Sequence, residues 1–256
     1  MQFAFPPLTP AVKLIAIVTG AAYLLEVLWV HWIAALVSPE VAAAGPEGWR
    51  LAVRQMHLAL HPPDVMRGHI WQLVTYMLIH DPVGPFHAIF NILFCWMFGA
   101  EFESRWGTKR FLRFYILCGA LAGVFVLIWG ALVPGEWGKL TLGSSGAVYA
   151  LFAAYAVIFP NRVLWPIPIK VKTFVWVLAG LTVLYFLVRS EASFAAHMGG
   201  LASGWLITTG NWRPRRIVDR IKLWQLKKRR SKMKVVSIDR SDTDDEGKGK
   251  NGRILH

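Results

Sequence analysis

The sequence has few charged side chains and few cysteines for its length. Asp, Glu, Lys and Arg make up only 17% of its 256 residues, whereas a soluble domain carries about a quarter. Hydrophobic residues make up 55%, with 13 Trp and 15 Phe. Long uncharged runs of this kind need lipid as their solvent, which excludes an ordinary soluble domain. Both cysteines, Cys95 and Cys118, lie within apolar runs, which argues against a disulfide framework.

Apolar residues gather in six segments separated by polar or Gly- and Pro-containing stretches. The first segment is too long for the core of a cleavable signal peptide, and we interpret it as a retained membrane span. We therefore predict an all-α polytopic membrane protein, with residues 1–212 forming a bundle of six transmembrane helices. The predicted spans are residues 14–37, 86–104, 110–133, 145–159, 170–188 and 193–209.

The longest connection, residues 38–85, is too long for a simple turn and mixes aromatic with polar residues. We expect it to form short helices in the outer membrane interface.

Positive charge is concentrated in the C-terminal part of the chain. The formal net charge is +13, and residues 213–256 hold 15 Lys or Arg against 6 Asp or Glu. We expect an amphipathic helix over 213–234 that contacts anionic lipid, followed by a disordered segment, 237–256. Together with the basic loops after the second and fourth segments, this tail predicts that both termini are cytoplasmic. No nucleic acid partner is expected.

The fourth apolar segment is shorter than the others. Residues 145–159 would span about 22 Å as a helix, less than the roughly 30 Å of a hydrocarbon core. Pro and Gly interrupt the stretch before it, 133–143, and irregular backbone survives at membrane depth only inside protein or beside a water-filled cavity. The sequence therefore predicts a polar pocket above a short, buried helix that begins at Ser145.

Two polar residues near the predicted pocket could form a nucleophile and its base. Ser145 alone could be a helix cap or a packing residue, and His197 alone could be a satisfied core histidine. An intramembrane histidine is nevertheless costly and commonly functional. The fourth and sixth segments run in the same direction and carry small residues that allow close approach, Gly146, Gly200 and Gly204. We predict that Ser145 and His197 meet at hydrogen-bond distance.

Further residues are expected to support this pair. Tyr149 lies one helical turn after Ser145, where it could pack against the His197 ring. His87 and Asn91 share one face at the start of the second segment, and two uncharged donors there suit a developing oxyanion. The alternatives are ordinary aromatic packing for Tyr149, a solvent-facing His87 and an interhelical hydrogen bond for Asn91.

These motifs, in this order, resemble the signatures of rhomboid proteases. The chain has His-x-x-x-Asn at 87–91, Gly-x-Ser-Gly at 143–146 and His-x-x-Gly-x-x-x-Gly at 197–204. The resemblance covers about residues 10–210 and implies a rhomboid-like bundle.

Glu103 and Gly107 resemble the acid and glycine that end the family's second span. Trp71 resembles the first residue of the family's Trp-Arg pair, but the second is replaced here by Gln72. That departure leaves the bracing of the first loop open.

The resemblance implies an intramembrane serine endopeptidase that cuts transmembrane protein substrates without a cofactor. Ser145 and His197 would form a dyad, and the oxyanion would be met by His87, Asn91 and the Ser145 backbone N–H. The resemblance also implies that Gly143, Gly146, Tyr149, Gly200 and Gly204 support the site. A six-span core without added spans resembles bacterial members, so a bacterial inner membrane is expected. A non-catalytic rhomboid-like protein that binds membrane helices is the alternative function.

Three other residues suggest different chemistry. Glu26 lies within the first span and could serve a proton or ion pathway, but we favour a structural hydrogen bond to a neighbouring helix. His57 and His61 have a spacing that can clamp a metal, yet no companion ligand completes an obvious set, so no metal is expected.

Overall fold

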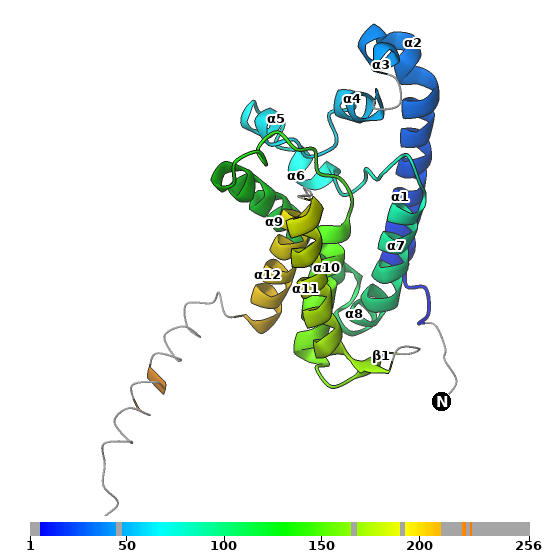
Figure 1. The fold of residues 1–256 in the computed structure, drawn as a ribbon. Coiled ribbons are helices and arrows are strands. Elements are labelled where there is room, and N and C mark those ends of the chain that lie inside the picture. Colours follow the sequence, from blue (N-terminus) through cyan, green and yellow to red (C-terminus); the bar gives the residue numbers. More distant parts are fainter. Residues whose placement is uncertain are drawn as a thin grey trace, which may run out of the picture. The chain divides into compact units, whose positions relative to one another are not determined.

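The computed structural model describes residues 6–44, 48–164, 168–189 and 193–210, together with Lys222, Leu223 and Leu226. The chain divides into two units, Met1–Gly210 and Asn211–His256. The first unit is mostly helical (Figure 1). The predicted tail helix and disordered end lie almost wholly outside the described residues, so they stay predictions.

Helices are present at all six apolar segments. The first stretch runs from Pro10 to Val37 and includes a π-helical turn, and the second runs from Phe86 to Trp106 with another. Three helical stretches among the described residues are long and apolar enough to cross a membrane: Pro10–Val37, Thr108–Leu132 and Val171–Val188. The elements of these six segments are α1 (Pro10–Leu28), η1 (Trp29–Ile33), α2 (Ala34–Val37), α7 (Phe86–Phe94), η3 (Cys95–Gly99), α8 (Ala100–Trp106), α9 (Thr108–Leu132), α10 (Ser145–Ile158), α11 (Val171–Arg189) and α12 (Ser193–Thr209).

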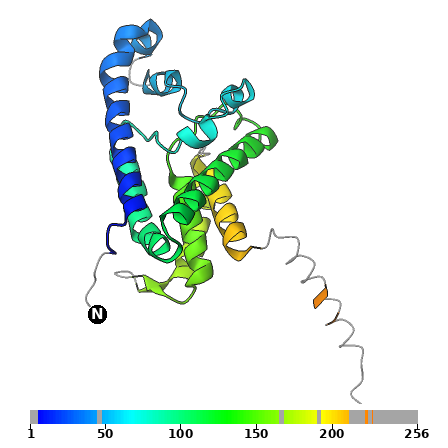
Figure 2. The same cartoon turned by 180° about the vertical axis from the view of Figure 1, so that it is seen from behind.

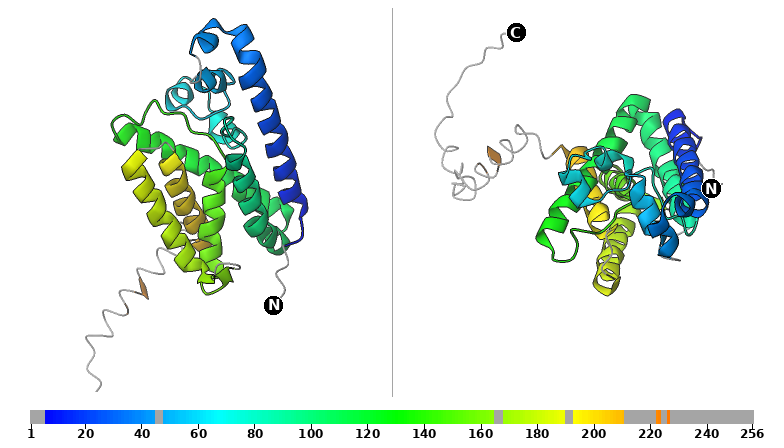
Figure 3. Two further views of the ribbon diagram at one scale, coloured as in Figure 1. Left: turned by 45° about the vertical axis from the view of Figure 1, so that its right-hand side comes forward. Right: turned by 90° about the horizontal axis from the view of Figure 1, so that it is seen from above.

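The long first loop contains the short helices predicted for it. They are α3 (Pro39–Ala43), α4 (Gly48–Gln55), α5 (Pro62–Met66) and α6 (Gln72–Thr75). Proline begins α3 and α5, as expected because its fixed φ suits the first helical turn. These helices gather at one end of the unit, and the two-stranded hairpin of β1 (Val163–Leu164) and β2 (Ile169–Lys170) lies at the other (Figures 1 and 3).

The short fourth helix, α10, lies in the middle of the unit. It packs against α12, α9, α11 and the second helical stretch, and Figure 3 shows it surrounded by them. Nine of its 14 residues are buried. The helix ends at Ile158, two residues before Pro160, which cannot donate a backbone hydrogen bond. The predicted short, buried helix is therefore present.

Glycines allow α10 and α12 to touch through their backbones. A Cβ on Gly200 would lie 2.0 Å from the carbonyl oxygen of Gly146, and one on Gly204 would lie 2.4 Å from that of Ala150. No larger residue fits either position without displacing backbone. Helix α9, which runs obliquely to α1 (Figure 2), closes the other side of Gly146 through Ala122.

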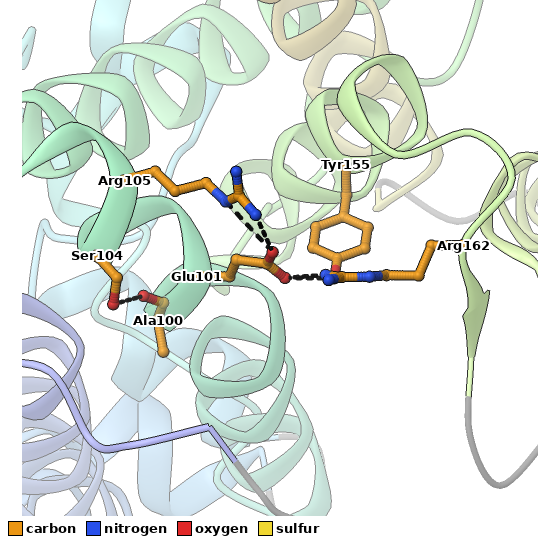
Figure 4. A network of polar contacts seen from close by, with 6 residues as sticks. All are labelled: Ala100, Glu101, Ser104, Arg105, Tyr155 and Arg162. Carbon is orange, nitrogen blue, oxygen red and sulfur yellow. Dashed lines mark hydrogen bonds and ion pairs between the residues drawn. The ribbon is translucent and has the colours of Figure 1, made fainter. Parts of the chain in front are cut away.

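Two carboxylates fasten the end of the unit opposite the loop helices. Glu103 accepts hydrogen bonds from the backbone N–H groups of Ala11 and Val12 and from the Thr108 hydroxyl. It thereby stabilises the N-terminus of α1, where free N–H groups favour negative charge. Glu101 binds Tyr155 of α10, Arg105 of its own helix and Arg162 beyond α10 (Figure 4). These contacts fix the C-terminal end of α10 against α8.

Replacing Gly200 by Ala should destabilise the protein, because the new methyl group would overlap the α10 backbone. Overpacking of this kind costs about 1–3 kcal/mol or more. Gly180 on α11 is the matched control, since a Cβ there meets nothing within 4 Å. In thermal unfolding of the purified protein, Gly200→Ala should lower the Tm and Gly180→Ala should leave it unchanged or raise it slightly. Equal Tm values for the two variants would contradict the backbone contact.

Candidate active site

Ser145 and His197 meet where α10 and α12 are closest. His197 Nε2 lies 2.9 Å from Ser145 Oγ, although the two residues are 52 positions apart. With the ring neutral and its proton on Nδ1, the serine hydroxyl donates to Nε2. A nucleophile bonded to a base in this way can lose its proton as it attacks.

Tyr149 packs against the ring of His197. Its ring stacks on that of His197 with centroids 3.9 Å apart and planes 4° apart. The Thr182 hydroxyl donates to the Leu178 carbonyl, so the Tyr149 hydroxyl is the donor in its 3.0 Å contact with Thr182. The imidazole is therefore oriented by packing, and its support is attached to α11.

His87 and Asn91 face the turn that precedes Ser145. Gly143 in that turn has a φ of +101°, and a Cβ on it would lie 2.7 Å from His87 Nε2 and 3.8 Å from Asn91 Nδ2. Only glycine adopts this conformation readily and leaves room for the imidazole. The Asn91 amide nitrogen, which carries two hydrogens, donates one of them to the His87 carbonyl at 2.8 Å. Both side chains thus lie against the turn before the serine, and their role as oxyanion donors stays a prediction.

A cavity of about 1350 Å³ joins these residues. It is lined by polar groups at the serine and by aromatic and aliphatic side chains of α7, α10 and α11. Its lining includes His87, Asn91, Ser145, Tyr149 and His197, with Phe90, Phe152 and Phe174. The predicted polar pocket at the start of the fourth helix is therefore present.

The match with known proteins agrees with this geometry. A family model described as "Rhomboid domain" matches residues 67–214, more than half of the chain and all of the residues above. The chain belongs to the rhomboid family.

Three rhomboid relatives illustrate the similarity. YdcA of Bacillus subtilis is 28% identical over 77% of this chain and 89% of its own length. The rhomboid protease GluP of B. subtilis is 26% identical over 55% of this chain and 26% of its own. The rhomboid protease GlpG of Yersinia pestis is 30% identical over 54% of this chain and 47% of its own. The chain therefore spans most of YdcA but less than half of GluP and GlpG.

Gln72, the residue that departs from the rhomboid Trp-Arg pair, braces the first loop from inside. It is buried, and its side-chain oxygen accepts the His61 N–H at 3.1 Å. Trp71 donates its indole N–H to the His57 carbonyl at 2.9 Å. His57 has a φ of +53°, a strained conformation for a residue with a side chain. The loop is thus braced by neutral hydrogen bonds at the position where the family places an arginine.

The sequence paired His57 with His61, and the structure rearranges this set. His61 lies 2.9 Å from Asp64, whereas the donor atoms of His57, Asp64 and His69 lie within 4.8 Å of one another. Burial opposes the charge on Asp64, but His61, Arg54 and Arg67 hold the pKa of its carboxyl below its ordinary value. The carboxylate is already matched by cations, so it offers little to a further positive ion.

Glu26 has a different partner from the one expected. Its carboxylate accepts the backbone N–H of His80 at 2.8 Å, so it binds a loop and not a neighbouring helix. The sequence shows that a buried carboxylate in a span needs a donor, but any backbone amide can supply one.

The stacked ring of Tyr149 predicts a graded response to substitution. Tyr149→Phe keeps the ring against His197 and loses only the hydrogen bond to Thr182, so Ser145 should react with a fluorophosphonate within about threefold of the wild-type rate. Tyr149→Leu removes the stack, and the rate should fall about tenfold or more because the base is no longer held. Gel-based labelling with Ser145→Ala as the blank measures both. Equal rates for Phe and Leu would refute an orienting role for the ring.

Proposed function

We propose that this rhomboid is an intramembrane serine endopeptidase that hydrolyses peptide bonds in or near transmembrane helices of other membrane proteins. The observation that carries the proposal is the 2.9 Å contact between Ser145 and His197 beside a cavity that also holds His87 and Asn91. A serine, a base and uncharged donors around one space are the groups that acyl transfer requires.

The proposed reaction has two halves. Ser145 Oγ bonds to the scissile carbonyl carbon while His197 Nε2 takes the hydroxyl proton. The carbonyl oxygen becomes an oxyanion that accepts hydrogen bonds from His87, Asn91 and the Ser145 N–H. The C–N bond then breaks as His197 protonates the leaving amine. Water then attacks the acyl carbon while His197 takes its proton. The ester bond to Ser145 Oγ breaks, and His197 returns the proton to the serine.

The dyad has no carboxylate in this proposal. Tyr149 orients the imidazole by stacking, which is the part that an aspartate plays in a triad. The substrate segment must be unwound at the cut, since a helix keeps its carbonyls in internal hydrogen bonds. Helix-breaking residues near the scissile bond should therefore favour cleavage.

The placement in the membrane is part of the same proposal. Six spans, formed by the six helical segments, would cross a bacterial inner membrane with both termini in the cytoplasm. The basic residues after 212 would then meet the anionic lipid of the inner leaflet. The alternative function is that of a rhomboid-like protein that binds membrane helices without cutting them. That function does not require a serine hydrogen-bonded to a histidine.

Cleavage of a single-span substrate in liposomes tests the function. Wild-type protein should cut it, and Ser145→Ala should lower the rate by at least about 10³-fold, since Ser145 carries the acyl group in the proposed reaction. Ser144→Ala is the matched control, because Ser144 is the buried neighbouring serine and its hydroxyl has no part in the proposed reaction. Cleavage by Ser145→Ala at the wild-type rate would overturn the assignment. Absence of both cleavage and fluorophosphonate labelling in the wild type would favour the binding protein.

A further inference from the structure

The last part of the loop between α6 and α7, residues 80–85, is tied to the first span at two points. Glu26 is fully buried and accepts the His80 N–H at 2.8 Å. Five residues later, His31 in the π-helical turn lies 3.2 Å from the Pro82 carbonyl, to which it can only donate. Both residues lie outside the stretch that the rhomboid family model matches. The polar side chains of the first span therefore hold the segment that leads into α7.

This loop in turn holds His87 by its ring. The Asp81 N–H donates to His87 Nδ1 at 3.3 Å, and the Asp81 carboxylate accepts the Val83 N–H at 2.9 Å. The His80 ring packs against the His87 ring with centroids 5.1 Å apart. Burial lowers the pKa of His80 to about 4, with a contribution from His87, so His80 stays uncharged at neutral pH.

The contact with Asp81 sets the position of the proton on His87. A backbone N–H can donate only to a ring nitrogen that has no hydrogen, so Nδ1 is bare and the proton of the neutral ring lies on Nε2. Nε2 is also one of the two ring atoms closest to Gly143, beside Ser145. An N–H donor of His87 therefore lies against the turn that leads to Ser145, where the proposed reaction forms its oxyanion. The opposite tautomer would present a lone pair there and repel it.

We propose that Glu26, assisted by His31, is a positioning residue that fixes the tautomer and orientation of His87 through the His80–Asp81 backbone. This inference deepens the proposed protease function and depends on it for its effect on catalysis. The tautomer itself does not depend on activity, so the two can fail separately.

The surroundings of the buried Glu26 carboxyl explain why its hydrogen bond to the loop matters. Tyr23, one turn earlier, and Asp81 both interact electrostatically with this carboxyl, and neither supplies a positive charge. A buried carboxyl without a cation is costly unless hydrogen bonds offset the cost. Among the described residues, the His80 N–H donates a hydrogen bond to Glu26, and this bond joins Glu26 to the loop.

The direct test is ¹⁵N NMR of histidine-labelled full-length protein in lipid bilayers. The His87 signals are assigned by their loss in His87→Ala. In the wild type, His87 Nδ1 should have the shift of an unprotonated nitrogen and Nε2 that of a protonated one. Glu26→Met, which keeps the volume and suits the span, should mix the two tautomers. Glu26→Gln, which keeps an acceptor oxygen, should preserve the wild-type pattern. An unchanged pattern in Glu26→Met would overturn the proposal.

Kinetics provide the second readout. Glu26→Met should lower kcat about tenfold or more with KM changed less than about twofold, since an oxyanion donor acts in the transition state. In a His87→Ala background the same substitution should have little further effect, and an undiminished effect would make Glu26 merely structural. Should Glu26→Met fail to fold, His31→Phe removes the second tie from an exposed ring. That variant should shift the tautomer in the same direction, and no shift would again overturn the proposal. A wild-type protein without activity but with the expected tautomer would refute the protease and leave the positioning intact.

Discussion

The backbone contact between α10 and α12 is the constraint on which the site depends. Gly200 and Gly204 lie so close to the carbonyls of Gly146 and Ala150 that a Cβ would overlap them. Only at that separation can a short serine side chain reach an imidazole on the neighbouring helix. In lipid, helices gain little from hydrophobic association, so close packing of small residues has to supply the attraction. The same contact thus stabilises the helix pair and brings Ser145 to His197.

The proposed reaction gives His197 no carboxylate partner, so its ring needs orientation from elsewhere. The Tyr149 ring supplies it from α10 itself, and the hydrogen bond to Thr182 fixes that ring against α11. The proposed oxyanion donors come from α7, where His87 and Asn91 lie against Gly143. The site therefore joins four helices, and none of these side chains is a carboxylate, a lysine or an arginine. Neutral groups are less costly than charges to keep in an apolar surrounding.

The sequence predicted those parts of the structure that depend on residue type and spacing. The lengths of the apolar segments predicted the helices. The glycines in 133–143 and Pro160 predicted where the short helix begins and ends. The three motifs predicted the positions of Ser145, His197 and His87. The sequence did not predict the π-helical turns or the partner of Glu26. Such features depend on backbone amides and on helix geometry, which any residue can supply. The Glu101 contact with Tyr155 and Arg162 was missed for a similar reason, because ion pairs between distant segments follow from the fold.

The two sides of the site are held by different means. The Ser145–His197 side is fixed by packed backbone and a stacked ring, which tolerate little change. His87 is held by a hydrogen bond from a loop. That loop is in turn bound by Glu26 and His31 of the first span. Burying a carboxyl in a span is unfavourable by itself. Glu26 nevertheless has a use in the proposed reaction. Without it the loop could move, and His87 could turn a lone pair toward the oxyanion. The buried Glu26 thus lowers the stability of the first span, and in return the proton of His87 stays on Nε2.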